Sequence, residues 1–324
     1  MCTAITFTGK DHYFGRNLDL EYHYQEAVTI TPRHFPFQFR MVNPLTSHYA
    51  LIGMATLAEG IPLYYDASNE KGLSMAGLNF PGNAVYQPTT TNATNVAPFE
   101  LIPWILGQCA NISEAMALLE NINIAKIPFN KEFPLSPLHW ILADQERSIT
   151  IEPMENGLHI YENPIRVLTN NPPFPYHLWN LNNYINLTRE EAENRFSQDL
   201  TLTPFSRGMG AIGLPGDLSS PSRFVRAAFT KFNALSYDDE NASITQFFHI
   251  LGSVAQQEGC VRVGDGFEKT IYSSCCNIDL GIYYYKTYEN SQITAVDMHK
   301  EDINGSKLVH YPLSFSQNIN YCNQ

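Results

Sequence analysis

The sequence predicts an α+β protein whose 324 residues form one large domain. Strand-like segments, rich in β-branched and aromatic residues between turn signals, fill the beginning and the end of the chain. Helical apolar periodicity dominates 98–121 and 220–254. Hydrophobic residues make up 44% of the chain, which is enough to bury a sizeable core. Because strand-rich blocks alternate with helix pairs, we expect sheets layered with helices in a single domain that spans 1–324.

The N-terminal part is expected to consist mainly of strands. The strand segments are 2–8, 12–20, 27–32, 49–57, 63–66 and 73–80. Two helices are expected within 98–121, because Pro98 suits a first helical turn and Asn111 with Glu114 forms an N-terminal capping pair. The apolar, proline-rich segment 127–138 is expected to be a loop that either packs on the body or lines a binding mouth.

The C-terminal part mixes strands with a second pair of helices. Its strand segments are 138–143, 148–152, 158–161, 166–169, 270–276, 281–288 and 292–298. Helices are expected to begin at Ser220-Pro221 and at Ser243, whose spacing to Gln246 is that of a capping box. The polar segment 180–205 has scattered charge and no period, so it is the candidate for a surface insertion or an assembly element.

Charge and cysteine content exclude several classes of protein. Lys and Arg total 20 against 32 Asp and Glu, and the net charge of −12 without a basic run argues against a nucleic-acid partner. We expect neither a secretory leader nor a membrane span, because no long apolar stretch occurs. The six cysteines lack CxxC spacing, so no disulfide framework, zinc site, other metal or cofactor is expected. A reducing cytoplasm, which keeps thiols free, fits this pattern.

Cys2 is the candidate nucleophile. Removal of Met1 would leave Cys2 with a thiol and a free α-amine on the same carbon. An α-amine titrates near ~7.7–8, so it can act as a base that is tethered to its own nucleophile. Arg16 can stabilise a thiolate, and Asp19 can accept a hydrogen bond from an ammonium or a thiol. Because strand side chains alternate, both can face Cys2 only if the strand ends or bulges near Leu18.

Ordered motifs along the whole chain resemble those of one enzyme family. The motifs are Cys2 to Ile5, Phe14 to Asp19, Asn69 to Leu73, Ala76 to Phe80, Leu168 to Pro172, and Gly213 to Asp217 leading into Ser222-Arg223-Phe224. This set resembles the choloylglycine hydrolase family, which contains bile salt hydrolases and penicillin V acylases within the N-terminal nucleophile hydrolases. The order of the motifs carries the resemblance, since each motif alone is weak.

The resemblance implies a four-layer αββα sandwich with two stacked antiparallel sheets, and an amide hydrolase. Amide cleavage needs fixed donors about 2.7–3.1 Å from the developing oxyanion. The family pattern places Asn79 and Asn170 in that role and Arg223 near the nucleophile. Taken alone, the asparagines suit turns or caps, and Arg223 suits a helix-terminal charge paired with Asp217.

The resemblance also implies the substrate and the assembly. Asn79 resembles the bile salt hydrolases, since penicillin V acylases tend to carry Tyr there, so glycine- or taurine-conjugated bile acids are the implied substrates. A homotetramer is the implied assembly. Candidates for a steroid pocket, each explained about as well by core packing, are Leu18, Leu20, Tyr24, Ala58, Tyr65, Phe129, Phe133 and Leu135.

Two other functions fit the sequence. A penicillin V acylase or acyl-homoserine lactone acylase of the same family would use the same Cys2 chemistry. A non-catalytic steroid-binding protein on this fold would retain or block Met1 and would bind its ligand without turnover. Release of amine from conjugated substrates by a chain lacking Met1 separates these alternatives.

Overall fold

The strands assemble into two large antiparallel sheets. A computed structural model describes residues 1–323. The first sheet contains β1 (Cys2–Thr8), β2 (His12–Leu20), β12 (Val167–Leu168), β13 (Val261–Val263), β14 (Gly266–Asn277), β15 (Ile282–Thr287) and β16 (Thr294–Asp297). The second contains β3 (Ala27–Thr31), β4 (Leu51–Ala58), β5 (Ile61–Asn69), β6 (Ser74–Asn79), β9 (Leu138–Ala143), β10 (Ser148–Met154), β11 (Gly157–Glu162) and β17 (Val309–Pro312).

The order of strands joins distant parts of the chain. The first sheet runs β12-β1-β2-β14-β15-β16, with β13 on β14, and the second runs β11-β10-β9-β6-β5-β4-β3-β17. A further parallel pair consists of β7 (Thr94–Val96) and β8 (Ile122–Ile124). Because β2 pairs with β14 and β3 with β17, strands from both ends of the chain lie side by side in each large sheet.

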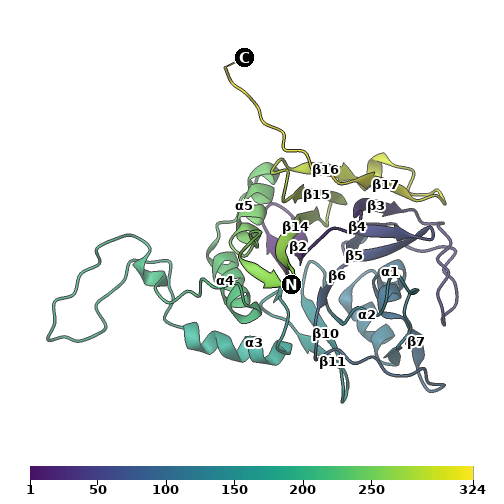
Figure 1. Cartoon of the computed structure of the whole chain (residues 1–324), viewed down its shortest axis with the longest axis horizontal. Coiled ribbons are helices and arrows are strands. Elements are labelled where there is room, and N and C mark those ends of the chain that lie inside the picture. The colour runs from purple at the N-terminus through teal and green to yellow at the C-terminus, as the bar shows by residue number, and fades with distance from the viewer. Residues whose placement is uncertain (324) are drawn as a thin grey trace.

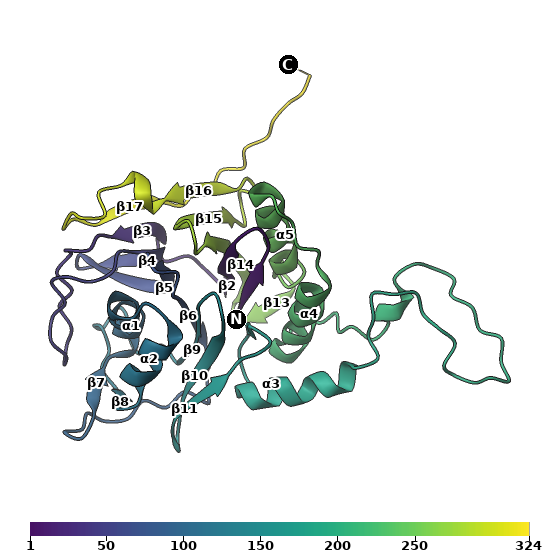
Figure 2. The same cartoon turned by 180° about the vertical axis from the view of Figure 1, so that it is seen from behind.

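Helices cover the outer face of each sheet (Figures 1 and 2). The helices are α1 (Leu101–Gln108), α2 (Ile112–Leu119), α3 (Phe174–Asn180), α4 (Ser220–Asn233) and α5 (Glu240–Gly252), with short 3-10 turns η1 (Pro98–Glu100), η2 (Leu181–Tyr184), η3 (Met209–Ala211) and η4 (Met298–Lys300). Helix α1 packs on β4, β5 and β6, whereas α4 and α5 pack on β1 and on neighbouring strands of the first sheet. The expected α+β architecture with two antiparallel sheets is confirmed.

Alternating side chains divide the core into layers. In β9, Ile141 and Ala143 join a core that includes both sheets, while Trp140 and Leu142 join a second core with α1 and α2. This alternation follows from the period of two in a strand, and burial of both faces explains why these strands read as continuous apolar runs.

A buried carboxylate ties the two sheets together. Asp66 of β5 is 1% exposed. It accepts hydrogen bonds from the hydroxyl groups of Tyr272 (2.7 Å), Tyr283 (2.6 Å) and Ser274 (3.3 Å) on the opposite sheet. Burial raises the pKa of Asp66, and Arg16 together with these hydroxyl groups opposes that rise. A buried polar group costs stability unless it is hydrogen-bonded, so this arrangement fixes how the sheets are placed relative to each other.

Helix starts show where the sequence expectations succeeded and failed. The capping pair of α2 is present, because the Asn111 side chain accepts from the Glu114 amide at 3.0 Å. The start expected at Ser243 is wrong. Helix α5 begins at Glu240, because Asp239 lies in the extended conformation and its side chain accepts from the Ala242 amide at 2.8 Å. The hydroxyl group of Ser243 instead donates to the carbonyl oxygen of Tyr237.

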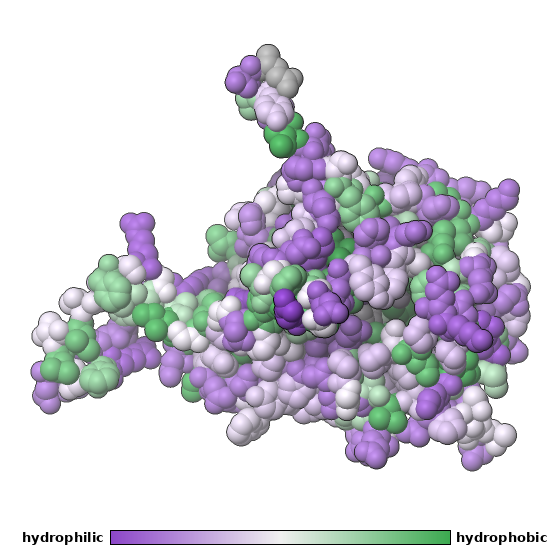
Figure 3. All heavy atoms as spheres, in the orientation of Figure 1, coloured by the Kyte–Doolittle hydropathy of each residue, from purple (hydrophilic) through white to green (hydrophobic). Residues whose placement is uncertain are grey.

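The polar segment after α3 leaves the body of the molecule. Residues beyond η2 form an extended arm that projects away from the sheets (Figures 1 and 2). The arm carries exposed apolar side chains, namely Phe196, Leu200, Leu202, Phe205 and Ile212. Green patches on this projection mark the same apolar character in the space-filling view (Figure 3). Within residues 1–323, no helix is long and apolar enough to cross a membrane.

We predict that Gly15→Ala strongly destabilises the fold. A Cβ at this position of β2 would lie 2.0 Å from the carbonyl oxygen of Ser274 on β14, so the two central strands would have to separate. Overpacking of this kind lowers the free energy of unfolding by ~1–3 kcal/mol. Urea denaturation measures the change. Gly252→Ala is the matched control, because nothing lies within 4 Å of a Cβ there, and its unfolding midpoint should not fall. Equal stability of Gly15→Ala and the unsubstituted chain would contradict the prediction.

Candidate active site

Cys2 lies at the wall of a cavity between the elements of the two sheets and helix α1. It is the first residue of β1, it pairs with Leu18 of β2, and it is 2% exposed. The cavity has a volume of about 390 Å³, and both Cys2 and Arg16 line it. A small molecule in this cavity would therefore meet the sulfur atom directly.

Arg16 supplies a buried positive charge on the cavity side of β2. Its Nη1 donates to the carbonyl oxygens of Tyr65 at 3.0 Å and Gly77 at 2.5 Å. Among the described residues, Nη2 has no hydrogen-bond partner. Burial acts to lower the pKa of Arg16, but interactions with the acidic groups of Cys2, Tyr272 and Asp66 outweigh it and raise the pKa overall. The guanidinium is thus a permanent cation with a donor that is unpaired within residues 1–323, and it lines the same cavity as Cys2.

Asp19 lies on the other face of β2, toward the helices. Its Oδ1 accepts from the Thr270 hydroxyl at 2.6 Å, and its Oδ2 lies 3.9 Å from Nη1 of Arg223. The bulge considered near Leu18 occurs on the partner strand, where the register of β14 shifts between Thr270 and Tyr272. Arg16 and Asp19 therefore keep opposite faces. Both nevertheless lie near Cys2. Arg16 lines the cavity together with Cys2, whereas Asp19 lies near Arg223 of α4, which binds the Cys2 main chain.

Arg223 reaches from α4 to the main chain of the nucleophile. Its Nη1 donates to the carbonyl oxygen of Cys2 at 2.5 Å and to the Thr3 hydroxyl at 2.6 Å. Burial lowers the pKa of Arg223, and the charges of Asp19 and Cys2 oppose that shift. The alternative pairing with Asp217 does not occur, because Asp217 accepts instead from the Ser219 amide and from the Ser222 hydroxyl.

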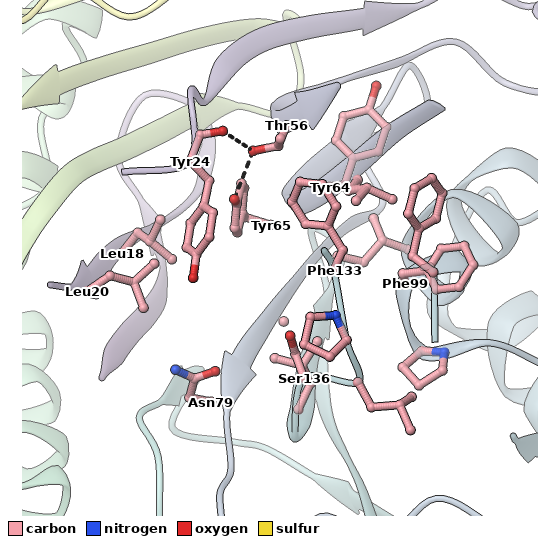
Figure 4. A pocket seen from close by; sticks show the side chains of 18 of the residues that line it. Leu18, Leu20, Tyr24, Thr56, Tyr64, Tyr65, Asn79, Phe99, Phe133 and Ser136 are labelled. Carbon is pink, nitrogen blue, oxygen red and sulfur yellow. Dashed lines mark hydrogen bonds between the residues drawn. The ribbon is translucent and has the colours of Figure 1, made fainter. Parts of the chain in front are cut away.

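Asn170 connects the nucleophile to Arg223 and Asn79. Its Oδ1 accepts from the main-chain nitrogen of Cys2 at 2.9 Å and from Nη2 of Arg223 at 2.6 Å. Its Nδ2 donates to the carbonyl oxygen of Asn79 at 2.7 Å. Asn79 ends β6 and lines the cavity, where its side chain lies below Leu20 in the close view (Figure 4). The structure thus brings the other five candidate catalytic residues, Arg16, Asp19, Asn79, Asn170 and Arg223, around Cys2.

The amine of the N-terminal methionine lies against β2 and β14. The Met1 amine donates to the carbonyl oxygen of Asp19 at 2.7 Å and forms an ion pair with the buried carboxylate of Glu268. Burial lowers the pKa of this amine. With Met1 attached, the nitrogen of Cys2 is an amide, which cannot take up a proton near neutral pH.

The cavity wall is mostly apolar and aromatic. Seven of the eight proposed wall residues line it, namely Leu18, Leu20, Tyr24, Tyr65, Phe129, Phe133 and Leu135. Ala58 does not, because it pairs with Ile61 at the closed end of the β4–β5 hairpin, beyond the cavity. Thr56, two residues earlier on β4, takes that place, and its hydroxyl group contacts the Tyr24 carbonyl oxygen (3.0 Å) and the Tyr65 hydroxyl (2.9 Å) (Figure 4).

Several wall residues were missed from the sequence. They are Thr56, Leu63, Tyr64, Phe99, Ile102, Ile127, Ser136, Leu138 and Trp140. The period of two along β4 and β5 was a usable signal for Thr56 and Leu63, which pair with each other. The contribution of Phe99 and Ile102 from η1 and α1 depends on the packing of α1 on β5 and had no local signal.

The chemistry that this arrangement allows is acyl transfer. A thiol beside a fixed cation can act as a nucleophile, and amide N–H groups can bind the oxygen that gains charge during attack on a carbonyl. The apolar wall would hold the acyl part of a substrate away from water.

Comparisons with known proteins agree with this geometry. Residues 2–311 match the model of the linear amide C–N hydrolases, choloylglycine hydrolase family. The chain is 55% identical over 314 residues to a "bile salt hydrolase/transferase" of Lactiplantibacillus plantarum, covering 97% of both proteins.

Solved structures show the same fold. A Cys-to-Ala (C2A) mutant of a conjugated bile acid hydrolase from Clostridium perfringens superposes with a TM-score of 0.92 at 36% identity, covering 100% of both chains. A penicillin V acylase from Agrobacterium tumefaciens shares the fold alone, with a TM-score of 0.73 at 19% identity and coverage of 95% and 90%. On the extent of these matches, the chain belongs to the choloylglycine hydrolase family of linear amide C–N hydrolases.

Proposed function

We propose that this protein is a bile salt hydrolase that cleaves glycine- or taurine-conjugated bile acids. The observation that carries the proposal is the hydrogen bond from the Cys2 main-chain nitrogen to Asn170, beside a cavity whose wall is mostly apolar. The relatives named for bile acid hydrolysis support the substrate class. A rigid apolar acyl group fits the aromatic wall, and the amide carbonyl would lie over Cys2.

The proposed nucleophile is the thiolate of a mature Cys2 that follows removal of Met1. The free α-amine accepts the thiol proton, and Asn170 and Asp19 hold the amine in place. Sulfur attacks the carbonyl carbon, and the oxyanion that forms is bound by amide donors of Asn79 and Asn170. The C–N bond breaks as the ammonium returns a proton to the leaving amine. Water then cleaves the thioester and releases the bile acid.

The two arginines act on opposite sides of this step. Arg16 stabilises the thiolate through its free Nη2, and Arg223 holds the Cys2 carbonyl oxygen and the Asn170 side chain in their places. Neither group needs to move a proton, because a guanidinium stays charged at neutral pH. Proton transfer is therefore left to the α-amine.

We also propose that the chain works as one catalytic domain, in a homotetramer, in the cytoplasm. The pairing of strands from both ends of the chain supports a single domain. The exposed apolar side chains of the arm support contact with further copies of the chain. A reducing compartment would keep the Cys2 thiol available.

The test of the function is amine release from a panel of conjugates. Glycine- and taurine-conjugated cholate should be cleaved much faster than penicillin V, and intact mass should show active protein that lacks Met1. Cys2→Ser should lower kcat by at least ~10³-fold, because loss of a catalytic nucleophile is that severe in other acyl-transfer enzymes. Cys260→Ser, at an exposed thiol, is the control and should keep full activity.

Two results would overturn this proposal. Faster cleavage of penicillin V than of the conjugates would move the chain to the acylase branch. Full activity in protein that retains Met1 would rule out the α-amine as the base.

We predict that Asn170→Ala lowers kcat far more than it raises KM. A donor to the oxyanion acts where charge develops, and its loss costs ~10²–10³-fold in kcat. Steady-state kinetics together with thermal melting measures the effect. Asn171→Ala is the matched control, because it loses a similar hydrogen bond, from Nδ2 to the Pro81 carbonyl oxygen at 2.6 Å, outside the nucleophile's contacts. An Asn170→Ala variant with unchanged kcat and a lower melting temperature would make Asn170 a structural residue only.

We predict that the arm mediates assembly. Light scattering after size exclusion should give four times the chain mass of 36.6 kDa. The double substitution Phe196→Ser and Phe205→Ser should yield smaller species, because these side chains are 81% and 87% exposed in the single chain. Ile319→Ser, at another exposed apolar residue, is the control and should leave the mass unchanged. A monomeric wild type, or a tetrameric double variant, would contradict this role.

A further inference from the structure

Asn170 lies on a loop whose main chain is hydrogen-bonded to two buried residues, His139 and Glu152, which are not part of the site described above. We infer that the buried pair His139–Glu152 is a positioning device that keeps Asn79 and Asn170 in register with each other. The inference rests on the proposed function, in which these two asparagines bind the oxyanion. Neither His139 nor Glu152 touches the nucleophile, so they act through the residues they hold.

His139 lies next to the segment that carries Asn79. It belongs to β9 and pairs with Leu78 of β6, the residue before Asn79. Its ring stacks on Phe80, the residue after Asn79, with ring centroids 4.2 Å apart and an angle of 5° between the planes. Both side chains are fully buried. The end of β6 is therefore held on both sides of Asn79 by contacts with one histidine.

The same histidine and its partner also hold the loop of Asn170. Nε2 of His139 donates to the carbonyl oxygen of Thr169 at 3.0 Å. Nδ1 lies 3.0 Å from Oε1 of Glu152, and the Glu152 carboxylate accepts from the Phe174 amide at 3.0 and 3.2 Å. The pair thus forms hydrogen bonds with the main chain of the loop at Thr169 and at Phe174, on either side of Asn170.

The hydrogen bonds define the protons that the pair must carry. A carbonyl oxygen only accepts, so Nε2 of His139 carries a hydrogen. The contact between Nδ1 and Glu152 needs a second hydrogen, on one atom or the other. With either placement the pair has no net charge, which is what a site with both side chains fully buried tolerates.

Two further contacts complete the support of Asn170. Nε2 of His177 donates to the Asn170 carbonyl oxygen at 2.9 Å, and the Asn170 amide donates to the Ser220 hydroxyl at 2.8 Å. Burial lowers the pKa of His177 to about 4, so this ring is neutral at physiological pH. Both main-chain polar groups of Asn170 are thus bound, and the position of its side chain depends on these two contacts together with the contact of His139 at Thr169.

The expected consequence of losing the pair is a displaced oxyanion donor. A shift of about 1 Å in a catalytic group can cost ~10²-fold in rate, even when the substituted residue lies away from the chemistry. The pair does not contact the sulfur, so thiolate reactivity should not change. Amide hydrolysis and simple alkylation of Cys2 therefore separate a positioning role from general damage to the fold.

The experiment compares four variants of the full-length mature protein. His139→Leu removes the hydrogen bond to the Thr169 carbonyl oxygen, and Glu152→Leu removes the acceptor for the Phe174 amide. Glu152→Gln keeps these bonds, since its side-chain amide can donate to Nδ1 of His139 and accept from the Phe174 amide. His48→Leu is the matched control, because His48 is also buried, with both ring nitrogens 2.7 and 2.9 Å from main-chain carbonyl oxygens, and lies outside the cavity.

Three measurements are made on each variant: kcat and KM for glycine-conjugated cholate, the rate of Cys2 alkylation by iodoacetamide, and the melting temperature. We expect His139→Leu and Glu152→Leu to lose ~10–100-fold in kcat with little change in KM or alkylation rate. Glu152→Gln and His48→Leu should keep kcat near the wild-type value. A fall in alkylation that matches the fall in kcat, or unchanged kcat in both leucine variants, would overturn the inference, and so would a Glu152→Gln variant as slow as Glu152→Leu.

A crystal structure of either leucine variant tests the geometry without any substrate. The distance from Nδ2 of Asn170 to the Asn79 carbonyl oxygen, 2.7 Å here, should lengthen beyond hydrogen-bonding range. An unchanged distance would refute the positioning role. This readout stands even if the wild-type protein cleaves no bile acid conjugate, a result that would instead overturn the proposed function.

Discussion

The structure depends on the burial of two guanidinium groups on opposite sides of one strand end. Arg16 and Arg223 are both fully buried, and a buried cation is stable only if acceptors surround it. Arg16 donates hydrogen bonds to the carbonyl oxygens of Tyr65 and Gly77 on the second sheet. Arg223 donates to the carbonyl oxygen of Cys2 and to the side-chain oxygen of Asn170. These bonds join a helix, the two sheets and the Asn170 loop at the first residue of β1. The position of Cys2 is therefore a result of how these two charges are satisfied.

Much of this architecture could be predicted from the sequence, for identifiable reasons. Strands such as β1, β2 and β14 are rich in β-branched and aromatic residues, and α2 has a side-chain cap, so local pattern and three-dimensional structure agree. The α+β class was predicted from the sequence pattern, and the family resemblance supplied the two stacked antiparallel sheets. Short edge strands such as β17 were not predicted, because β17 pairs with β3 almost three hundred residues away and has no local signal of its own.

The candidate catalytic residues were easier to select from the sequence than the contacts that surround them. Cys2, Arg16, Asp19, Asn170 and Arg223 stand in short motifs, whereas the contacts between them join residues far apart in the chain. The contacts of Asp66, which bonds across both sheets, and of His139, which stacks on Phe80, depend on strand pairing and have no local sequence signal. Ala58 was wrongly expected in the cavity wall for a simple reason. Thr56, which lines the cavity, and Ala58, which lies at the end of the β4–β5 hairpin, are only two residues apart and lie on the same face of β4.

The placement of the two chain ends bears on how the protein can be handled. The N-terminus lies inside the fold, against Asp19 and Glu268, and the C-terminal segment extends freely away from the body (Figures 1 and 2). An affinity tag or a surface linker joined to the N-terminus would begin at an amine that already contacts Asp19 of β2 and Glu268 of β14, and it would leave the Cys2 nitrogen as an amide. The same fusion at the C-terminus would extend into solvent. Immobilisation on a resin or an electrode is therefore best done through the last residues of the chain.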